Sequence, residues 1–178
     1  MSSREDEFRR NNVEGPVKVG IVMGSWSDWS TMEPAFNVLT ELKVAAEAGV
    51  ISAHRTPHLI QPYAERAQGS GFSAVIAGAG GAAHLPGMLA AYLAGLPVIG
   101  VPVKTSTLSG VDSLYSIAQM PPEVPVATVA IAGGLNAGLL AAQIAATSDA
   151  HLQQRLIIRR SRLSSLVDSH PDPVDDPR

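Results

Sequence analysis

The sequence contains no cysteine, and only 4% of its 178 residues are aromatic. The lack of cysteine excludes disulfides, a thiol nucleophile, an iron–sulfur cluster and any zinc site built on thiolates. With 13 Lys+Arg against 16 Asp+Glu, the chain also lacks the basic excess of nucleic-acid-binding proteins. No apolar run reaches the roughly 18 residues of a membrane span, and residues 1–15 lack the apolar core of a signal peptide. We therefore expect a cytoplasmic protein that binds neither nucleic acid nor membranes.

Short apolar runs alternate with longer segments of helical periodicity. In the first such segment, apolar side chains recur three or four residues apart from Trp29 to Leu42, which predicts one buried helix face. Strands that alternate with helices at this spacing form a parallel sheet covered on both faces. The pattern therefore predicts an α/β fold of flavodoxin-like order with a five-stranded parallel sheet. The expected strands are 17–23, 45–51, 74–77, 97–101 and 126–131, and the later helices begin near 57, 85, 111, 136 and 150.

The length fits a single domain, since one domain takes roughly 150 residues. We expect a flexible N-terminal extension over residues 1–15 and one α/β catalytic domain over residues 16–167, including a C-terminal helix. Residues 168–178 are rich in proline and aspartate, which predicts a disordered tail.

Polar residues and glycines follow the first three predicted strands, at 24–28, 52–57 and 78–84. Ligands of open α/β sheets bind outside the carboxyl ends of the strands, where these three turns meet. In the first turn, Ser25, Ser27 and Asp28 precede a helix, whose N-terminus attracts anions. Ser27 or Asp28 could equally serve as the helix cap, and one side chain can do both.

The second turn contains Ser52 and the only adjacent His–Arg pair of the chain, His54 and Arg55. Arginine presents a planar, permanently charged fork that binds phosphate or carboxylate. An imidazole can accept or donate a proton near neutral pH. A structural hydrogen bond is the usual role of a histidine at a strand end, but the neighbouring arginine favours a functional one here.

The third turn fits the pattern G-x-G-x-x-A, which is typical of dinucleotide-binding proteins. It follows the third strand instead of the first, and no acidic residue lies about 20 residues further on, so a nicotinamide cofactor is disfavoured. Its glycines either allow a tight turn with positive φ or bring backbone N–H groups close to an anionic or planar ligand. No metal-binding motif, P-loop or G-x-S-x-G motif occurs, and we predict no metal.

Several longer segments resemble the N5-carboxyaminoimidazole ribonucleotide mutases of purine biosynthesis. The resemblance runs in order over roughly residues 17–165, and two of the segments are long and specific. It is carried by GSWSDW at 24–29, SAHRTP at 52–57, AGAGGAAHLPGM at 77–88, GVDSLYSIAQMP at 110–121 and NAGLLAAQI at 136–144.

This resemblance implies an enzyme without metal or cofactor that moves a carboxylate from the exocyclic nitrogen of an aminoimidazole ribonucleotide to ring carbon C4. It implies a three-layer αβα sandwich assembled as a homo-octamer, and it allows a functional link to the synthetase that makes the substrate. His54 would be the general acid and base. The expected substrate-binding residues are Ser25, Ser27, Asp28, Ser52, Arg55, the loop of Ala79, Gly80 and Gly81, and the adjacent His84 and Leu85.

Three positions depart from the family pattern: Trp26, the segment 91–96 and the segment 130–135. Two alternative functions stay open. One is an enzyme that carboxylates aminoimidazole ribonucleotide directly with CO2. The other is a non-catalytic flavodoxin-like module, either a flavin carrier or a phospho-receiver. The few aromatic residues disfavour the flavin carrier, and Ala77 and Gly78 at the end of the third strand disfavour the receiver, which needs an aspartate there.

Overall fold

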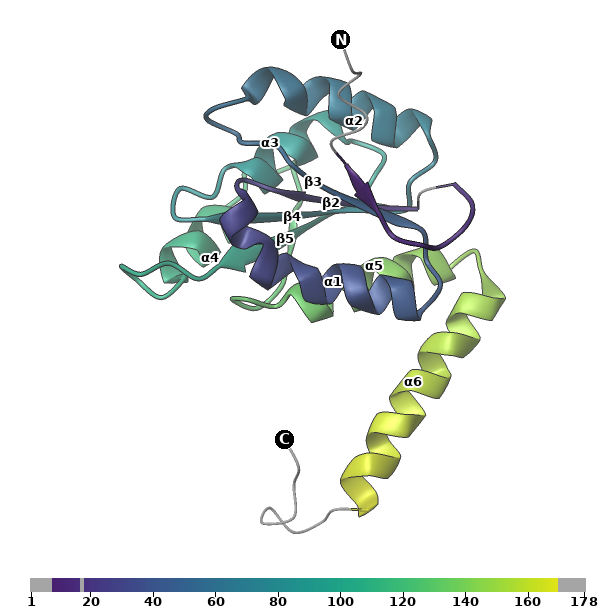
Figure 1. Ribbon diagram of the computed structural model, residues 1–178. Coiled ribbons are helices and arrows are strands. Elements are labelled where there is room, and N and C mark those ends of the chain that lie inside the picture. The colour runs from purple at the N-terminus through teal and green to yellow at the C-terminus, as the bar shows by residue number, and fades with distance from the viewer. Residues whose placement is uncertain (1–7, 17, 170–178) are drawn as a thin grey trace.

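The computed structural model describes residues 8–16 and 18–169, and its centre is a six-stranded sheet (Figure 1). The strand order is β1-β3-β2-β4-β5-β6. Strands β2 to β6 pair in parallel, whereas β1 pairs with β3 in the antiparallel direction. The strands are β1 (Arg9–Arg10), β2 (Val19–Met23), β3 (Ala46–Val50), β4 (Ala74–Gly80), β5 (Val98–Val103) and β6 (Ala127–Thr128). The predicted α/β fold of flavodoxin-like order is confirmed, with β1 as a sixth strand.

Helices cover both faces of the sheet, α1 and α5 on one and α2 and α3 on the other (Figure 1). Their bounds are α1 (Trp29–Glu41), α2 (Ile60–Gly69), α3 (Leu85–Tyr92), α4 (Val111–Ala118), α5 (Gly134–Ala146) and α6 (Ala150–Ser169). Short 3-10 turns over Trp26–Asp28 and Pro57–Leu59 precede α1 and α2. None of the helices in the described ranges is long and apolar enough to cross a membrane.

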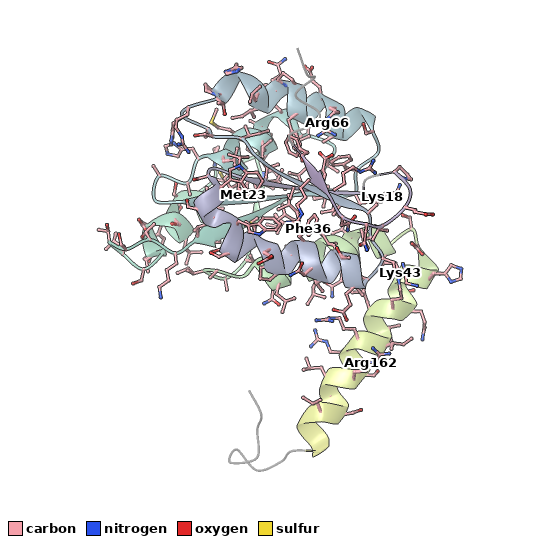
Figure 2. The ribbon with its side chains drawn as sticks, in the orientation of Figure 1. Lys18, Met23, Phe36, Lys43, Arg66 and Arg162 are labelled. Atoms are coloured by element: carbon pink, nitrogen blue, oxygen red, sulfur yellow. The ribbon has the colours of Figure 1, made fainter. Side chains whose placement is uncertain are left out.

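Alternation along the strands divides the core into two layers. On β2, Ile21 and Met23 face the layer beneath α1 and α5, whereas Val22 faces the opposite layer. Figure 2 shows the two sides, with Phe36 between the sheet and α1 and Arg66 on α2 across the sheet. Period-two alternation with both faces buried is what a central parallel strand requires.

Small residues bring α1 and α5 into close contact. A Cβ atom on Gly138 would lie 2.8 Å from the Cα atom of Ala35, too close for any larger residue. The abundance of alanine and glycine in α5 therefore has a packing cause, because close-packed interiors leave no room for added methyl groups.

Helix α6 starts against the body and then projects away from it (Figure 1). Near its start, Arg155 donates a hydrogen bond of 2.8 Å to the carbonyl of Leu42, and Arg159 forms an ion pair with Glu41. Further along, the labelled side chain of Arg162 lies well outside the body in Figure 2. One end of α6 is thus anchored to the end of α1, while the other end extends beyond the domain.

Three details correct the sequence-based expectations. Arg9–Arg10 lies in the segment expected to be a flexible extension, yet it pairs with β3, and the Asn11 side chain donates to the Val44 carbonyl and accepts from the Ala46 N–H. The strand expected over 126–131 is limited to β6. The helix α6 runs to residue 169, two residues into the expected disordered tail, while residues 170–178 and 1–7 lie outside the described residues.

Candidate active site

A cavity of about 370 Å³ opens at the carboxyl ends of β2, β3 and β4. Strand order reverses between β2 and β4, so the cavity lies at the switch point where open α/β sheets bind ligands. Its wall is built from the three turns expected from the sequence. The lining residues are Gly24, Ser25, Asp28, Ser52, Ala53, His54, Arg55, Ala79, Gly80, Ala82, His84 and Leu85.

The first turn presents a hydroxyl and a carboxylate to the cavity. Asp28 is the N-cap residue of α1, one of the two candidates expected, but its side chain makes no capping hydrogen bond. Ser25 caps the preceding 3-10 turn by accepting a hydrogen bond of 3.3 Å from the Ser27 N–H. Burial raises the pKa of the Asp28 carboxyl, although hydrogen bonds from Ser25 and Ser27 and the charge of Arg55 act in the opposite direction. Ser27 itself lies outside the cavity wall and contacts Asp28 at 3.4 Å.

The second turn places the Arg55 side chain against the backbone of the first turn. Its guanidinium donates hydrogen bonds of 2.9 Å to the Gly24 carbonyl and 3.2 Å to the Ser52 hydroxyl. Both acceptors are neutral, and Arg55 forms no salt bridge with any residue in the described part of the chain. Its positive charge is therefore available to an anion bound in the cavity.

Two imidazoles meet at the cavity wall. The Nε2 atom of His54 lies 2.8 Å from the Nδ1 atom of His84, and the two rings are nearly perpendicular. Both side chains are exposed to solvent at the cavity, so a ligand can reach them. One nitrogen of this pair must donate and the other accept, so the tautomer of one ring determines the role of the other.

The glycine-rich turn after β4 contributes backbone and small side chains. Ala79, Gly80 and Ala82 line the cavity, whereas Gly81 does not. The Gly81 N–H instead donates a hydrogen bond of 2.9 Å to the hydroxyl of Ser113 on α4. Sequence reasoning missed Ser113, although it lies within the segment 110–121 that carried part of the resemblance.

A second hollow of about 580 Å³ adjoins the first and shares Ser25, Ser52 and Arg55 with it. Its remaining wall is formed by Val50, Thr56, Leu59 and the exposed indole of Trp26. Trp26 also packs edge-to-face on Trp29 at 6.4 Å between ring centroids.

The described residues include no group of three or more His, Asp or Glu side chains placed to hold a metal ion. The residues at the cavity combine a guanidinium whose hydrogen-bond acceptors are neutral, a hydroxyl-rich turn, an accessible imidazole pair and a small-residue loop. This set can bind the phosphate of a small molecule and exchange protons with its reacting end.

Comparison with known proteins identifies the family. Residues 18–165 match the family model described as AIR carboxylase. The chain belongs to this family. The match covers the whole sheet except β1 and includes every residue of the cavity wall.

Relatives named N5-carboxyaminoimidazole ribonucleotide mutase are 50–56% identical to this AIR carboxylase family member. The protein of Vibrio vulnificus is 53% identical over 90% of this chain and 100% of its own length. That of Haemophilus influenzae is 56% identical over 88% of this chain and 96% of its own. The crystal structure of Treponema denticola PurE shares the fold, with a TM-score of 0.76, 23% identity and coverage of 89% of this chain and 98% of that one.

Proposed function

We propose that this protein converts N5-carboxyaminoimidazole ribonucleotide to 4-carboxy-5-aminoimidazole ribonucleotide in purine biosynthesis. The observation that carries the proposal is the accessible imidazole of His54, which shares one cavity with Arg55 and the glycine-rich loop. The names of relatives that are 50–56% identical over most of the chain support the same reaction.

The phosphate of the substrate binds at the first two turns. Arg55 supplies the charge, and Ser25 supplies a hydroxyl beside the backbone N–H groups that precede α1. Asp28 is within the same wall and accepts hydrogen bonds from ribose hydroxyls. Binding energy from these groups, remote from the reacting atoms, orients the aminoimidazole ring toward His54.

His54 moves the protons of the reaction. It first protonates the exocyclic nitrogen, the N–C bond breaks, and CO2 departs while the bonding electrons stay on nitrogen. Ring carbon C4 then attacks the CO2, and His54 removes the C4 proton to restore the aromatic ring. The proton given at the start is thereby recovered at the end, so one imidazole completes the cycle. His84, at 2.8 Å, fixes the orientation of the His54 ring and shares its proton.

CO2 must stay beside the ring between the two steps. Ala53, Ala79, Gly80 and Ala82 give the cavity a wall of small side chains and backbone near His54. Such a wall leaves space for a linear molecule of three atoms and excludes water when substrate fills the rest.

A direct assay tests the proposal. The purified protein is given N5-carboxyaminoimidazole ribonucleotide in a buffer stripped of bicarbonate, and formation of the C4-carboxylated product is measured. Turnover under these conditions supports the mutase. The description of the matching family favours one alternative, the direct carboxylase. Turnover that requires the uncarboxylated ribonucleotide and added bicarbonate would establish that alternative and exclude the mutase.

We also propose that the chain assembles into an octamer through α6. Three apolar side chains on the described part of α6, those of Ile157, Ile158 and Leu163, are 43–55% exposed in the single chain. A second copy that covers them would remove this surface from water. Light scattering should give eight times the 18.6 kDa chain mass, and a stable monomer would contradict the proposal. The link to a synthetase and the cytoplasmic location stay predictions.

A further inference from the structure

We propose that Ser113 is a positioning residue that holds the glycine-rich loop in the shape needed to retain CO2 during turnover. The inference rests on the proposed function for its chemistry, and on contacts of the described residues for its geometry. Ser113 itself does not line the cavity and touches no reacting atom. It acts through Gly81, whose neighbours Gly80 and Ala82 form the cavity wall.

Ser113 is completely buried, and its hydroxyl both accepts and donates a hydrogen bond. The Oγ atom accepts the hydrogen bond from the Gly81 N–H at 2.9 Å and donates one to the Val103 carbonyl at 2.7 Å. These two partners follow or end neighbouring strands, since Gly80 and Val103 are paired in the sheet. One hydroxyl on α4 thus joins the loop after β4 to the end of β5.

The hydrogen bond fixes a backbone conformation that is weakly determined by local sequence. Gly81 has φ of +66°, in the left-handed region, and glycine explores a wider range of φ and ψ than any other residue. A loop of alanine and glycine has few side chains to restrain it. The Ser113 hydroxyl supplies the missing restraint at the residue where the chain turns away from the sheet.

The start of α4 is itself held in place from a second side. Thr105 donates a hydrogen bond of 2.9 Å to the carboxylate of Asp112, the residue next to Ser113. The Asp112 carboxylate also lies about 4.0 Å from where a Cβ atom on Gly81 would be. Ser113 therefore projects from a helix turn that is itself held in place, which is what a residue that positions the loop requires.

Loss of the restraint has a specific chemical consequence. When the loop moves, CO2 released from the substrate nitrogen can escape before C4 attacks it. The N–C bond then breaks, the nitrogen retains the proton received from His54, and uncarboxylated ribonucleotide and free CO2 leave. The variant enzyme would convert part of the substrate to uncarboxylated ribonucleotide instead of product, a result that general loss of folded protein does not give.

The test compares Ser113→Ala with Ser116→Ala, a half-exposed serine on the same helix. Substrate loss, product and uncarboxylated ribonucleotide are measured above the enzyme-free rate, together with KM. For Ser113→Ala we expect kcat to fall about tenfold, KM to change less than about twofold, and the uncarboxylated fraction to rise severalfold, because small misplacements near the reacting atoms are costly. Ser116→Ala should match the wild type.

Exchange of the Gly81 amide hydrogen with solvent gives a readout independent of the reaction. In substrate-free protein, NMR should show this amide exchanging at least about tenfold faster in Ser113→Ala than in Ser116→Ala, since only the former removes its acceptor. Unchanged exchange would overturn the restraint. If Ser113→Ala does not fold, Ser113→Cys takes its place, because it fills the same space with a much weaker hydrogen-bonding group.

The two proposals fail in different ways. If the wild type forms no product from the N-carboxylated substrate, the proposed function is wrong. Amide exchange then still tests whether Ser113 restrains Gly81. A wild type that turns over, beside a Ser113→Ala enzyme with the same kcat and no extra uncarboxylated ribonucleotide, overturns the role of Ser113 alone.

Discussion

Arg55 and Arg66 place the same guanidinium group in opposite situations. Arg66 pairs with the buried carboxylate of Glu47, and its guanidinium carbon lies 5.1–5.7 Å from the centroids of three aromatic rings. Among the described residues, the Arg55 guanidinium donates hydrogen bonds to neutral oxygens, those of Gly24 and Ser52, and faces a cavity. The charge of Arg66 is neutralised inside the protein, whereas that of Arg55 is left for a ligand.

The residues around the two arginines differ in the same way. We call Arg66, Glu47, Phe8 and Tyr63 the closed cluster, and Arg55, His54 and His84 the open cluster. Around Arg66, the stacked rings of Phe8 and Tyr63 seal the site, and the Tyr63 hydroxyl is fully buried. Around Arg55, the imidazoles of His54 and His84 stay exposed. The two groups of residues thus differ in whether the charge of the arginine is neutralised by a carboxylate of the protein.

The largest effect should come from His54→Asn in the open cluster. Asparagine keeps a polar side chain of similar size but cannot carry the proton, so turnover should fall at least about a hundredfold while ligand binding changes less than about tenfold. Steady-state kinetics and calorimetric titration measure the two quantities. His151→Asn, on the exposed start of α6, is the control and should change neither. Full turnover by His54→Asn would show that another group carries the proton.

The two arginines should respond in opposite ways to substitution by alanine. Arg55→Ala should weaken binding of a ribose phosphate about tenfold to a hundredfold, because it removes charged hydrogen bonds to the ligand. The thermal midpoint should stay nearly unchanged, since the hydrogen bonds of Arg55 within the protein go to neutral acceptors and are not fully buried. Arg66→Ala should leave binding unchanged but destabilise the fold by about 2 kcal/mol, less than a fully buried pair because Arg66 is partly exposed. Calorimetric titration measures the ligand affinity of both variants, and thermal unfolding measures their stability. If both variants lost affinity equally, or both lost stability equally, the contrast between the two arginines would be wrong.

Tyr63→Phe should make the closed cluster more stable. Burial raises the pKa of Tyr63 far above its ordinary value, and the nearby charge of Glu47 acts in the same direction. Within the described residues the hydroxyl has no hydrogen-bond partner, so its removal should stabilise the protein by about 1 kcal/mol. This corresponds to a thermal midpoint about 2–4 °C higher, with turnover unchanged. A lower midpoint would show that the hydroxyl is hydrogen-bonded in solution.

The smallest effect concerns Asp28 and depends on pH. Because burial raises its pKa, the ionised carboxylate destabilises the fold above that pKa, and this penalty disappears as the pH falls and the group is protonated. Asp28→Asn should therefore raise the thermal midpoint by at most about 2 °C at pH 7, with the gain shrinking toward acidic pH. Thermal unfolding across pH 3–8 measures this. If the gain in thermal midpoint of Asp28→Asn grew on acidification, the pKa of Asp28 would be lowered in the folded protein and not raised.

The sequence predicts the sheet and the position of the cavity because both follow from local pattern. Apolar runs define the parallel strands, and the rule that ligands bind at strand ends directs attention to the three turns that line the cavity. Strand β1 escapes prediction because Arg9–Arg10 has no apolar alternation and is held by distant contacts of Asn11.

Contacts between residues far apart in the chain were also beyond reach of the sequence. His54 and His84 are 30 residues apart, and Gly81 and Ser113 are 32 apart. No spacing rule joins such pairs, since only the packed sheet and helices bring them together. Ser27 and Gly81, expected to bind substrate, lie outside the cavity wall, and their contact with substrate stays a prediction.

The central claim is that CO2 released from the substrate stays in the cavity until C4 captures it. The direct measurement supplies unlabelled N5-carboxyaminoimidazole ribonucleotide to the wild type in a buffer of ¹³C-bicarbonate and carbonic anhydrase, and determines the product mass at early times. Retained CO2 gives product without the label. Product whose carboxylate carries ¹³C in proportion to the labelled pool would contradict the account, because its carbon would have come from solution.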